Sequence, residues 1–309
     1  MKKLFFLLQL FLFIGFNFFL LTAVYQLAES AESINLPDRD KDPLYGFREN
    51  FDPSLVRLNS LSKIAGYCDS LYAERSYNQL SKFEEIYPDI VSSVIRDRFY
   101  HGYSSYRFSN NFFGKLISKF GMNGLNAIVI PDDILKYPYA ACSQQSIVFM
   151  EILKRKGFTT RKVGFNGKTT GHFCFEVYYE GGWHFYDPDM EPDNQVLTAY
   201  NHPSIALLVR HQDILLRAYN QYPKETVLDI FPTYFYGQVN SFEAPRAIIF
   251  QKVTKILSYS IWTVFLLLFI MVRKKYKRLS SKLNVRTNRI RFPQLQPGTS
   301  PVYYPEYQA

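Results

Sequence analysis

The chain has 309 residues, a length that allows one or two domains of ordinary size with room for a hydrophobic core. It carries 36 lysine and arginine residues against 27 aspartate and glutamate residues, a formal net charge of +9. Only three cysteines are present, which excludes the disulfide framework of a small secreted domain.

Residues 1–24 form the first predicted element, an N-terminal transmembrane anchor. After two lysines, residues 4–24 contain no charged side chain and are rich in leucine and phenylalanine. Such a run is long enough to span a bilayer and exceeds the apolar core of an ordinary signal peptide. A signal peptide cleaved before Ala31 is the alternative interpretation of the same segment.

A polar spacer over residues 25–52 is expected to lead into a helical region. From Leu55 to Leu71 apolar residues recur at helical spacing, and Asp52 is placed to cap the first turn. Phe83–Arg98 and Phe112–Leu125 are also predicted to be helices, with Pro88 breaking the first of them. Together these helices would form one half of a domain that extends over residues 53–245.

Cys142 is predicted to open an apolar helix. Ser143–Lys156 carries an apolar pattern typical of a mostly buried helix, and Gly157 follows as a stop signal. The unpaired N–H groups and the dipole of a first helical turn favour a thiolate, the form of cysteine that attacks carbonyl groups. Tyr137 and Tyr139 are candidates for a hydroxyl near the resulting oxyanion.

A hairpin supplies the expected partners of this cysteine. His172–Tyr178 alternates as a strand, and Trp183–Asp187 is predicted to return beside it after a turn with Gly181 in a left-handed conformation. His172 and Asp187 then lie nearly opposite each other. Asp187 would fix the tautomer of the imidazole, and His172 would take the proton of the thiol.

The other two cysteines have different expected roles. Cys68 lies in a helical stretch and is interpreted as a core residue. Cys174 shares a strand face with His172, so it should line the site as a wall residue. A second nucleophile and a disulfide between Cys142 and Cys174 are alternatives. A metal site is a further alternative, built from Cys142, His172, Cys174 and His184. It is disfavoured because His184 should face away and no Cys-x-x-Cys pair exists.

The segment 130–192 resembles the transglutaminase-like superfamily, which has a papain-like core. The resemblance rests on a cysteine opening a helix, a Gly-x-x-x-Arg-x-Val stretch, a His-x-x-x-Glu-Val strand and a Gly-x-Trp-x-x-x-Asp-Pro return. Here the matching residues are Cys142; Gly157, Arg161 and Val163; His172, Glu176 and Val177; and Gly181, Trp183, Asp187 and Pro188. The chain departs from the pattern at the Ala-Ala before Cys142 and at Cys174, where tryptophan is common.

This resemblance implies an α+β fold in which a helical half packs on an antiparallel sheet, with Cys142, His172 and Asp187 as catalytic residues. The implied activity is that of a thiol enzyme acting on amide or peptide bonds through an acyl-enzyme, as a protease or amidase with water and as a transglutaminase with an amine. No cofactor or metal is implied. A protein or peptide would be the substrate, with envelope proteins as further partners.

A second apolar run, residues 256–272, contains seventeen residues without a charge. A dense basic cluster, Arg273–Arg278, follows it at once. These flanks predict a second transmembrane helix, although a buried helix of a soluble domain has the same composition.

The positive charge is concentrated at the two ends of the chain. Nine basic residues and one acid lie from Arg273 onward, while residues 4–272 carry 25 basic and 26 acidic side chains. The positive-inside rule then predicts both termini in the cytoplasm and the middle of the chain outside. The basic stretch 273–309 is expected to be a disordered cytoplasmic tail. Since the excess lies on the ends rather than on a folded face, nucleic-acid binding is not predicted.

The sequence is also compatible with two functions that are not enzymatic. The domain could be a non-catalytic binding or scaffold module of an envelope assembly, or a two-helix anchor that positions the cytoplasmic tail. Loss of one of the three candidate residues would favour a binding module, and this sequence keeps all three.

Overall fold

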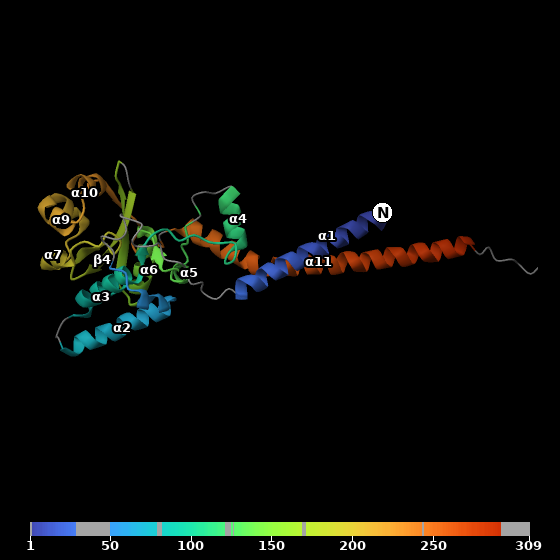
Figure 1. The fold of residues 1–309 in the computed structure, drawn as a ribbon, viewed down its shortest axis with the longest axis horizontal. Helices are drawn as coiled ribbons and strands as arrows, with labels where there is room; N and C mark the ends of the chain where they lie inside the picture. The colour runs from blue at the N-terminus through green and yellow to red at the C-terminus, as the bar shows by residue number, and fades with distance from the viewer. Residues whose placement is uncertain are drawn as a thin grey trace, which may run out of the picture. The chain divides into compact units, whose positions relative to one another are not determined.

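The computed structural model describes residues 2–28, 50–78, 82–120, 125, 127–168, 171–242 and 244–291 (Figure 1). The chain forms two compact units. One combines residues 1–24 with 259–309, and the other contains residues 25–258. Helices and an antiparallel sheet are both present, which confirms the mixed helix-and-sheet class expected from the sequence.

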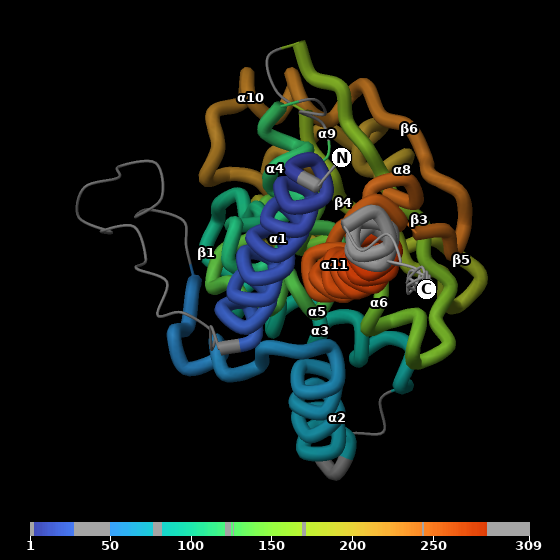
Figure 2. Tube along the Cα trace, turned by 90° about the vertical axis from the view of Figure 1, so that its right-hand side faces the viewer, coloured from blue at the N-terminus to red at the C-terminus, as the bar shows by residue number. Residues whose placement is uncertain are grey.

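The first unit contains the larger parts of two apolar helices, α1 (Lys2–Ala28) and α11 (Pro245–Arg291). The segments Lys3–Leu27 and Pro245–Lys282 of these helices are long and apolar enough to cross a membrane. Within the unit the helices lie side by side (Figure 2). Aromatic rings join them in antiparallel order, with centroids 6.2–6.3 Å apart for Phe16–Trp262 and Phe5–Tyr276. The two basic ends of the chain therefore lie at the same end of this helix pair.

Gly15 allows this approach of the two helices. A Cβ atom at Gly15 would lie 2.4 Å from the ring of Phe265, so any larger residue would displace that ring. The ring of Phe265 also lies against Phe11 and Phe19 of α1. Helix α1 thus contacts α11 through a face made mainly of phenylalanine.

The basic stretch after the second apolar run differs from expectation. Residues 273–291 continue α11 as a helix and do not begin a disordered tail. Lysine and arginine are good helix formers, and the first proline after Arg273 is Pro293, so nothing local stops the helix earlier. Residues 292–309 and most of the predicted spacer, residues 29–49, lie outside the described residues.

The second unit begins with a series of helices that ends with the Cys142 helix. They are η1 (Pro53–Arg57), α2 (Leu61–Asn78), α3 (Phe83–Arg98), α4 (Phe112–Phe120), α5 (Pro131–Ile134) and α6 (Cys142–Arg155). Of these, α2, α3 and α5 pack against α6. As predicted, the Asp52 side chain caps the first of them by accepting from the Ser54 N–H at 2.8 Å. That first element is a short 3₁₀ helix, and the α-helix expected there begins only at Leu61.

The prediction that Pro88 breaks a helix is wrong, because α3 runs through it from Phe83 to Arg98. Pro88 lies near the start of α3, where its missing N–H would have bonded to the carbonyl of Glu84. Glu84 is exposed, so water can satisfy that carbonyl. The loss of a single hydrogen bond at a solvated end is therefore tolerated.

The sheet has the order β5-β4-β3-β6, with all neighbours antiparallel. Its strands are β3 (Thr159–Asn166), β4 (Gly171–Tyr179), β5 (Gly182–Tyr186) and β6 (Tyr234–Tyr236). A separate parallel pair joins β1 (Tyr100–His101) to β2 (Tyr139–Ala140). Four short helices complete the unit: α7 (Asn194–Ala199), α8 (Ile205–Arg210), α9 (Gln212–Ala218) and α10 (Lys224–Ile230).

The two faces of the sheet have separate cores. Phe175 and Val177 of β4 pack with α6 and the N-terminal helices, whereas Cys174 packs with α7–α10 on the other face (Figure 1). The alternation predicted for this strand is thus correct. Both cores are apolar and fully buried at their centres, which fixes the strand register because a one-residue slip would exchange the faces.

The start of α11 belongs to the second unit. Gln251 donates to the carbonyl of Ala127 at 2.5 Å and accepts from the N–H of Val129 at 2.9 Å. Lys255 forms an ion pair with the buried Asp133 at 2.6 Å. These bonds attach α11 to α5 and to the loop that precedes it, close in sequence to the start of the Cys142 helix.

Three residues of the sequence pattern described above stabilise the fold: Arg161, Glu176 and Trp183. Glu176 is fully buried and forms an ion pair with Arg161 at 2.5 Å, and its other oxygen accepts from the N–H of Ile205 at 2.7 Å. The guanidinium of Arg161 lies between the rings of Trp183 and Tyr236, 4.0 and 3.7 Å from their centroids. This cluster joins β3, β4, β5 and β6 with the start of α8.

Loss of the Glu176 carboxylate should destabilise the fold. In Glu176→Ala the Arg161 guanidinium would remain partly buried without its partner, and breaking a buried pair costs about 3–5 kcal/mol. The melting temperature of the full chain in detergent, followed by near-ultraviolet circular dichroism, should fall by roughly 6–20 °C. Lys82→Ala, which breaks an exposed ion pair with Glu180, is the matched control and should melt with the wild type. Equal melting of both variants would contradict a structural role for the buried pair.

Candidate active site

Cys142 is the first residue of α6, as predicted, and its side chain is partly exposed. The preceding turn is held by the buried side chain of Gln144. Its oxygen accepts from the N–H groups of Ala141 at 3.1 Å and Ser104 at 3.0 Å, and its nitrogen donates to the carbonyls of Ser104 and Ile128, both at 2.9 Å. The thiol is therefore presented from a fixed backbone.

Arg98 stabilises the chain on the approach to this helix. The side chain is fully buried and donates to four backbone carbonyls, those of Val56, Leu58, Leu135 and Tyr137. Burial lowers its pKa to about 10, which leaves the guanidinium charged at neutral pH. These bonds tie the end of α3 to η1 and to the segment that leads into Cys142.

The hairpin brings His172 and Asp187 together. His172 lies near the start of β4 and Asp187 directly follows β5, and Nε2 of the imidazole is 2.9 Å from Oδ2 of the carboxylate. Both side chains are buried. The contact between the two residues was expected, but the register of the hairpin differs from the expected one. Phe175 pairs with Tyr186, so Asp187 comes next to the position of Cys174 and reaches His172 along the strand rather than from directly opposite.

Asp187 has further partners that fix its orientation. Oδ2 also accepts from the hydroxyl of Tyr219 at 2.8 Å, and Oδ1 accepts from the N–H groups of Asp189 and Met190 at 3.2 and 3.1 Å. Burial disfavours the carboxylate, but His172, the Met190 N–H and the Tyr219 hydroxyl together hold the pKa of Asp187 below its usual value. The carboxylate is thus a buried anion with a full set of donors.

Burial and the carboxylate of Asp187 have opposite effects on the pKa of His172. Burial, the largest influence, disfavours the imidazolium, but the charge of Asp187 and the hydrogen bonds to Asp187 and Cys142 contribute to a pKa of His172 well above its usual value. Burial also raises the pKa of Cys174, so this neighbouring thiol is protonated at neutral pH. Asp187 is then the anion that favours the imidazolium.

The thiol of Cys142 lies beside His172 and also beside a second carboxylate, that of Asp189. One ligand atom of each of these three residues lies within 4.8 Å of the other two. Asp189 accepts from Gln145 Nε2 at 3.0 Å and lies 3.0 Å from Nδ1 of His101. The arrangement therefore holds an acid and a second histidine that the sequence analysis did not identify.

The residues that the sequence did not indicate come from both near and distant parts of the chain. His101 is on β1, Gln145 is one turn into α6, and Tyr219 follows α9. Of these residues, only Asp189 could have been proposed from the sequence, because it lies two residues after Asp187 in the same loop. Nothing in the local sequence distinguishes Tyr219 from the other tyrosines of this aromatic-rich chain.

The remaining predicted residues lie elsewhere or have other partners. His184 faces away from His172, with its ring nitrogens 2.8 and 3.1 Å from the carbonyls of Asn201 and Tyr179. The buried hydroxyl of Tyr137 accepts from Nδ2 of Asn110 at 2.9 Å. All three cysteines are free, Cys174 lies in the wall beside His172, and Cys68 is a core residue.

The start of α6 offers donors for an oxyanion. The N–H groups of Gln144 and Gln145 bond to the carbonyl of Ala141 at 2.8 and 2.9 Å. The first N–H groups of a helix have no acceptor within the helix, so those of Cys142 and Ser143 are available to a negative atom that forms on a group attached to the thiol.

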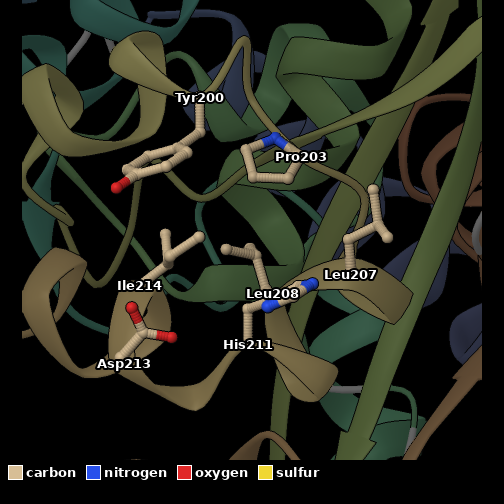
Figure 3. Close-up of a pocket in the computed structure, with 7 residues that line it drawn as sticks. All are labelled: Tyr200, Pro203, Leu207, Leu208, His211, Asp213 and Ile214. Carbon is tan, nitrogen blue, oxygen red and sulfur yellow. The ribbon is translucent and has the colours of Figure 1, made fainter.

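A pocket of about 430 Å³ lies apart from these residues, between α8, α9 and the preceding loop (Figure 3). Its lining is mainly apolar, with Tyr200, His211 and Asp213 as the polar side chains. None of Cys142, His172 and Asp187 lines it.

Comparison with family models, with curated proteins and with solved structures finds no match for this chain.

The cysteines should differ sharply in reactivity. Iodoacetamide at neutral pH should modify Cys142, which is partly exposed at a helix start beside an imidazole. Cys68 should stay unmodified in the folded chain because it is fully buried and its pKa is raised to about 12. Cys174 should stay unmodified for the same reasons.

Peptide mapping by mass spectrometry after a short exposure measures all three cysteines at once, and denatured protein provides the control in which they react equally. Similar rates for the three thiols in the folded chain would contradict an activated Cys142.

Proposed function

We propose that the chain is a membrane-anchored thiol enzyme that cleaves or transfers acyl groups of amide bonds through an acyl-enzyme. One observation carries the proposal: a partly exposed thiol at a helix start lies beside a histidine whose other nitrogen is held by a buried, fully bonded carboxylate. A nucleophile, its base and an orienting acid are the groups that this chemistry requires.

In the first step the Cys142 sulfur attacks the carbonyl carbon of an amide, and the thiol proton resides on His172. The carbonyl oxygen becomes an oxyanion, which the N–H groups of Cys142 and Ser143 would stabilise. The carbon–nitrogen bond then breaks, and the imidazolium gives its proton to the leaving amine. A thioester on Cys142 and a neutral His172 remain.

In the second step neutral His172 takes a proton from water or from an amine, which attacks the thioester carbonyl. The carbon–sulfur bond breaks and leaves the Cys142 thiolate beside the imidazolium. With water the product is a carboxylic acid, and with an amine it is a new amide. Asp187 stabilises the imidazolium in both steps, and its bonds to Tyr219 and the backbone prevent it from rotating.

The resemblance to the transglutaminase-like superfamily supports this proposal beyond the three site residues. Arg161, Glu176 and Trp183 form one cluster around the buried carboxylate of Glu176. Gly157 and Gly181 have φ angles of 84° and 78° that favour glycine. These residues of the transglutaminase-like pattern therefore stabilise the fold around the three site residues. We accordingly assign the domain to a transglutaminase-like class with protein or peptide substrates.

We further propose that α1 and α11 anchor the enzyme in a membrane, with both termini in the cytoplasm and the domain outside. The support is the antiparallel pairing of the two apolar helices, which puts the lysines before Leu4 and the basic cluster after Val272 at one end. The positive-inside rule assigns such an end to the cytoplasm.

Substitution should separate the roles of the three residues. Turnover of an activated ester by detergent-solubilised full chain should disappear in Cys142→Ala and nearly disappear in His172→Ala. Asp187→Asn should retain the nucleophile but lower turnover by about 10²–10⁴-fold, since the imidazole loses its orienting anion.

The pH profile provides a second readout for Asp187. Activity requires the protonated His172, so it should fall as the pH rises through the pKa of this residue. Asp187 raises that pKa, so the alkaline limb of Asp187→Asn should move to lower pH. Full turnover by Cys142→Ala, with a normal circular dichroism spectrum, would contradict the enzyme proposal and favour a binding module.

Protease protection tests the proposed orientation. Protease added to intact cells stripped of any outer layer should digest the domain and spare the basic cluster after Val272, detected with a C-terminal epitope. The same treatment after detergent lysis should remove the epitope as well. Loss of the epitope from intact cells with the domain preserved would contradict the orientation.

A further inference from the structure

A thiol, an imidazole and a carboxylate converge at the proposed active site in a way that also suits a metal ion. Cys142, His172 and Asp189 each place a ligand atom within 4.8 Å of the other two. Sulfur, nitrogen and oxygen ligands of this kind are those of tetrahedral Zn²⁺ sites, with three protein ligands and an open fourth position. We propose that this cluster binds one Zn²⁺ ion, and that the bound ion reversibly blocks Cys142.

The orientation of His172 supports this set of ligands. Nε2 is engaged with Asp187 at 2.9 Å, so Nδ1 is the nitrogen that remains for a metal. Nδ1 lies 4.0 Å from Oδ2 of Asp189, a separation that one bridging ion can span with small side-chain movements. A zinc-bound histidine commonly donates its other N–H to a carboxylate, and Asp187 already has that position.

Asp189 is also held in the manner of a metal ligand. Its Oδ1 accepts from Gln145 Nε2 and lies beside His101 Nδ1, each at 3.0 Å. These contacts leave Oδ2 directed toward His172. Ligating carboxylates typically have such outer hydrogen bonds, which fix their orientation and strengthen binding.

A second cluster with the same residue types fits a metal less well. His172, Cys174 and Asp187 also lie within 4.8 Å of one another, but all three are buried. Asp187 already accepts four hydrogen bonds, including that from Tyr219, so its oxygens are occupied. In the first cluster Cys142 is partly exposed and the neighbouring His101 side chain is 43% exposed, which gives an ion a path from solvent.

The inhibitory consequence rests on the proposed function, whereas metal binding does not. The sulfur lone pair that would attack a carbonyl would instead bind Zn²⁺, and Nδ1 could no longer exchange a proton with the thiol. Zinc should therefore protect Cys142 from acylation, and a chelator should restore its reactivity.

The test is a Co²⁺ titration of the full chain in detergent, without a polyhistidine tag and after removal of metals by a chelator. Cobalt reports a bound thiolate by a near-ultraviolet charge-transfer band, and Zn²⁺ should displace it. The proposal expects one equivalent per chain. Removal of a ligand in Cys142→Ala, His172→Ala or Asp189→Asn should weaken binding by more than roughly 100-fold, and Asp187→Asn, which alters an outer contact, by about 10–100-fold.

Cys174→Ala and Cys68→Ala are the matched controls, and both should bind cobalt as the wild type does. Near-ultraviolet circular dichroism of each variant verifies the fold. Absence of a stoichiometric band in the wild type, or loss of the band in Cys174→Ala, would overturn the site. If the band survives unchanged in both His172→Ala and Asp189→Asn, cobalt binds to a thiol without these two ligands, and this result would also overturn the proposed site.

Acylation of Cys142 measured in the presence of a chelator separates this inference from the proposed function. Acylation without metal binding refutes only the zinc site. Metal binding without any acylation supports the site and refutes the enzyme. Faster acylation in the zinc-loaded chain would contradict the inhibitory role.

Discussion

The buried carboxylate of Asp187 is the constraint on which the rest of the site depends. A buried anion is costly unless charge and hydrogen bonds compensate for the lost water, and Asp187 has four such contacts. They come from β4, from the residue after α9 and from the loop that follows β5. Satisfying this one group therefore fixes the imidazole and the course of the chain as far as Met190.

Because the loop after Asp187 is fixed, Asp189 is placed as well. Its carboxylate lies between the imidazole of His172 and the side chains of Gln145 and His101. The start of α6 is independently fixed by Gln144, which uses both ends of its amide. Two segments of backbone, each held by hydrogen bonds, thus meet at the thiol, and such pre-organised groups favour catalysis.

Local sequence patterns predicted the parts of this structure that depend on local physics. The helix that begins at Cys142, the alternation of β4 and the turn at Gly181 each follow from the residues of one segment. The proximity of His172 and Asp187 followed because a tight hairpin relates residues on either side of its turn. The two apolar helices were also visible from composition alone.

The rest depends on contacts between distant segments or on context. Tyr219 and His101 reach the site only through tertiary packing, and no local pattern marks them. Pro88 is tolerated because it lies near an exposed helix start, which a periodicity argument cannot reveal. The helix after Val272 continues to Arg291 because no residue stops it, whereas the expectation of disorder rested on the prolines that begin only at Pro293.

Labelling with a thiol-directed acyl probe is the most direct test of Cys142 as the nucleophile. The purified full chain is exposed briefly to a thiol-directed acyl probe, and the modified residue is mapped by mass spectrometry. We expect a single stoichiometric thioester on Cys142 in the folded wild type, strongly reduced in His172→Ala, and no preference for Cys142 after heat denaturation. Modification at Cys68 or Cys174, or none in a folded wild-type chain, would contradict it.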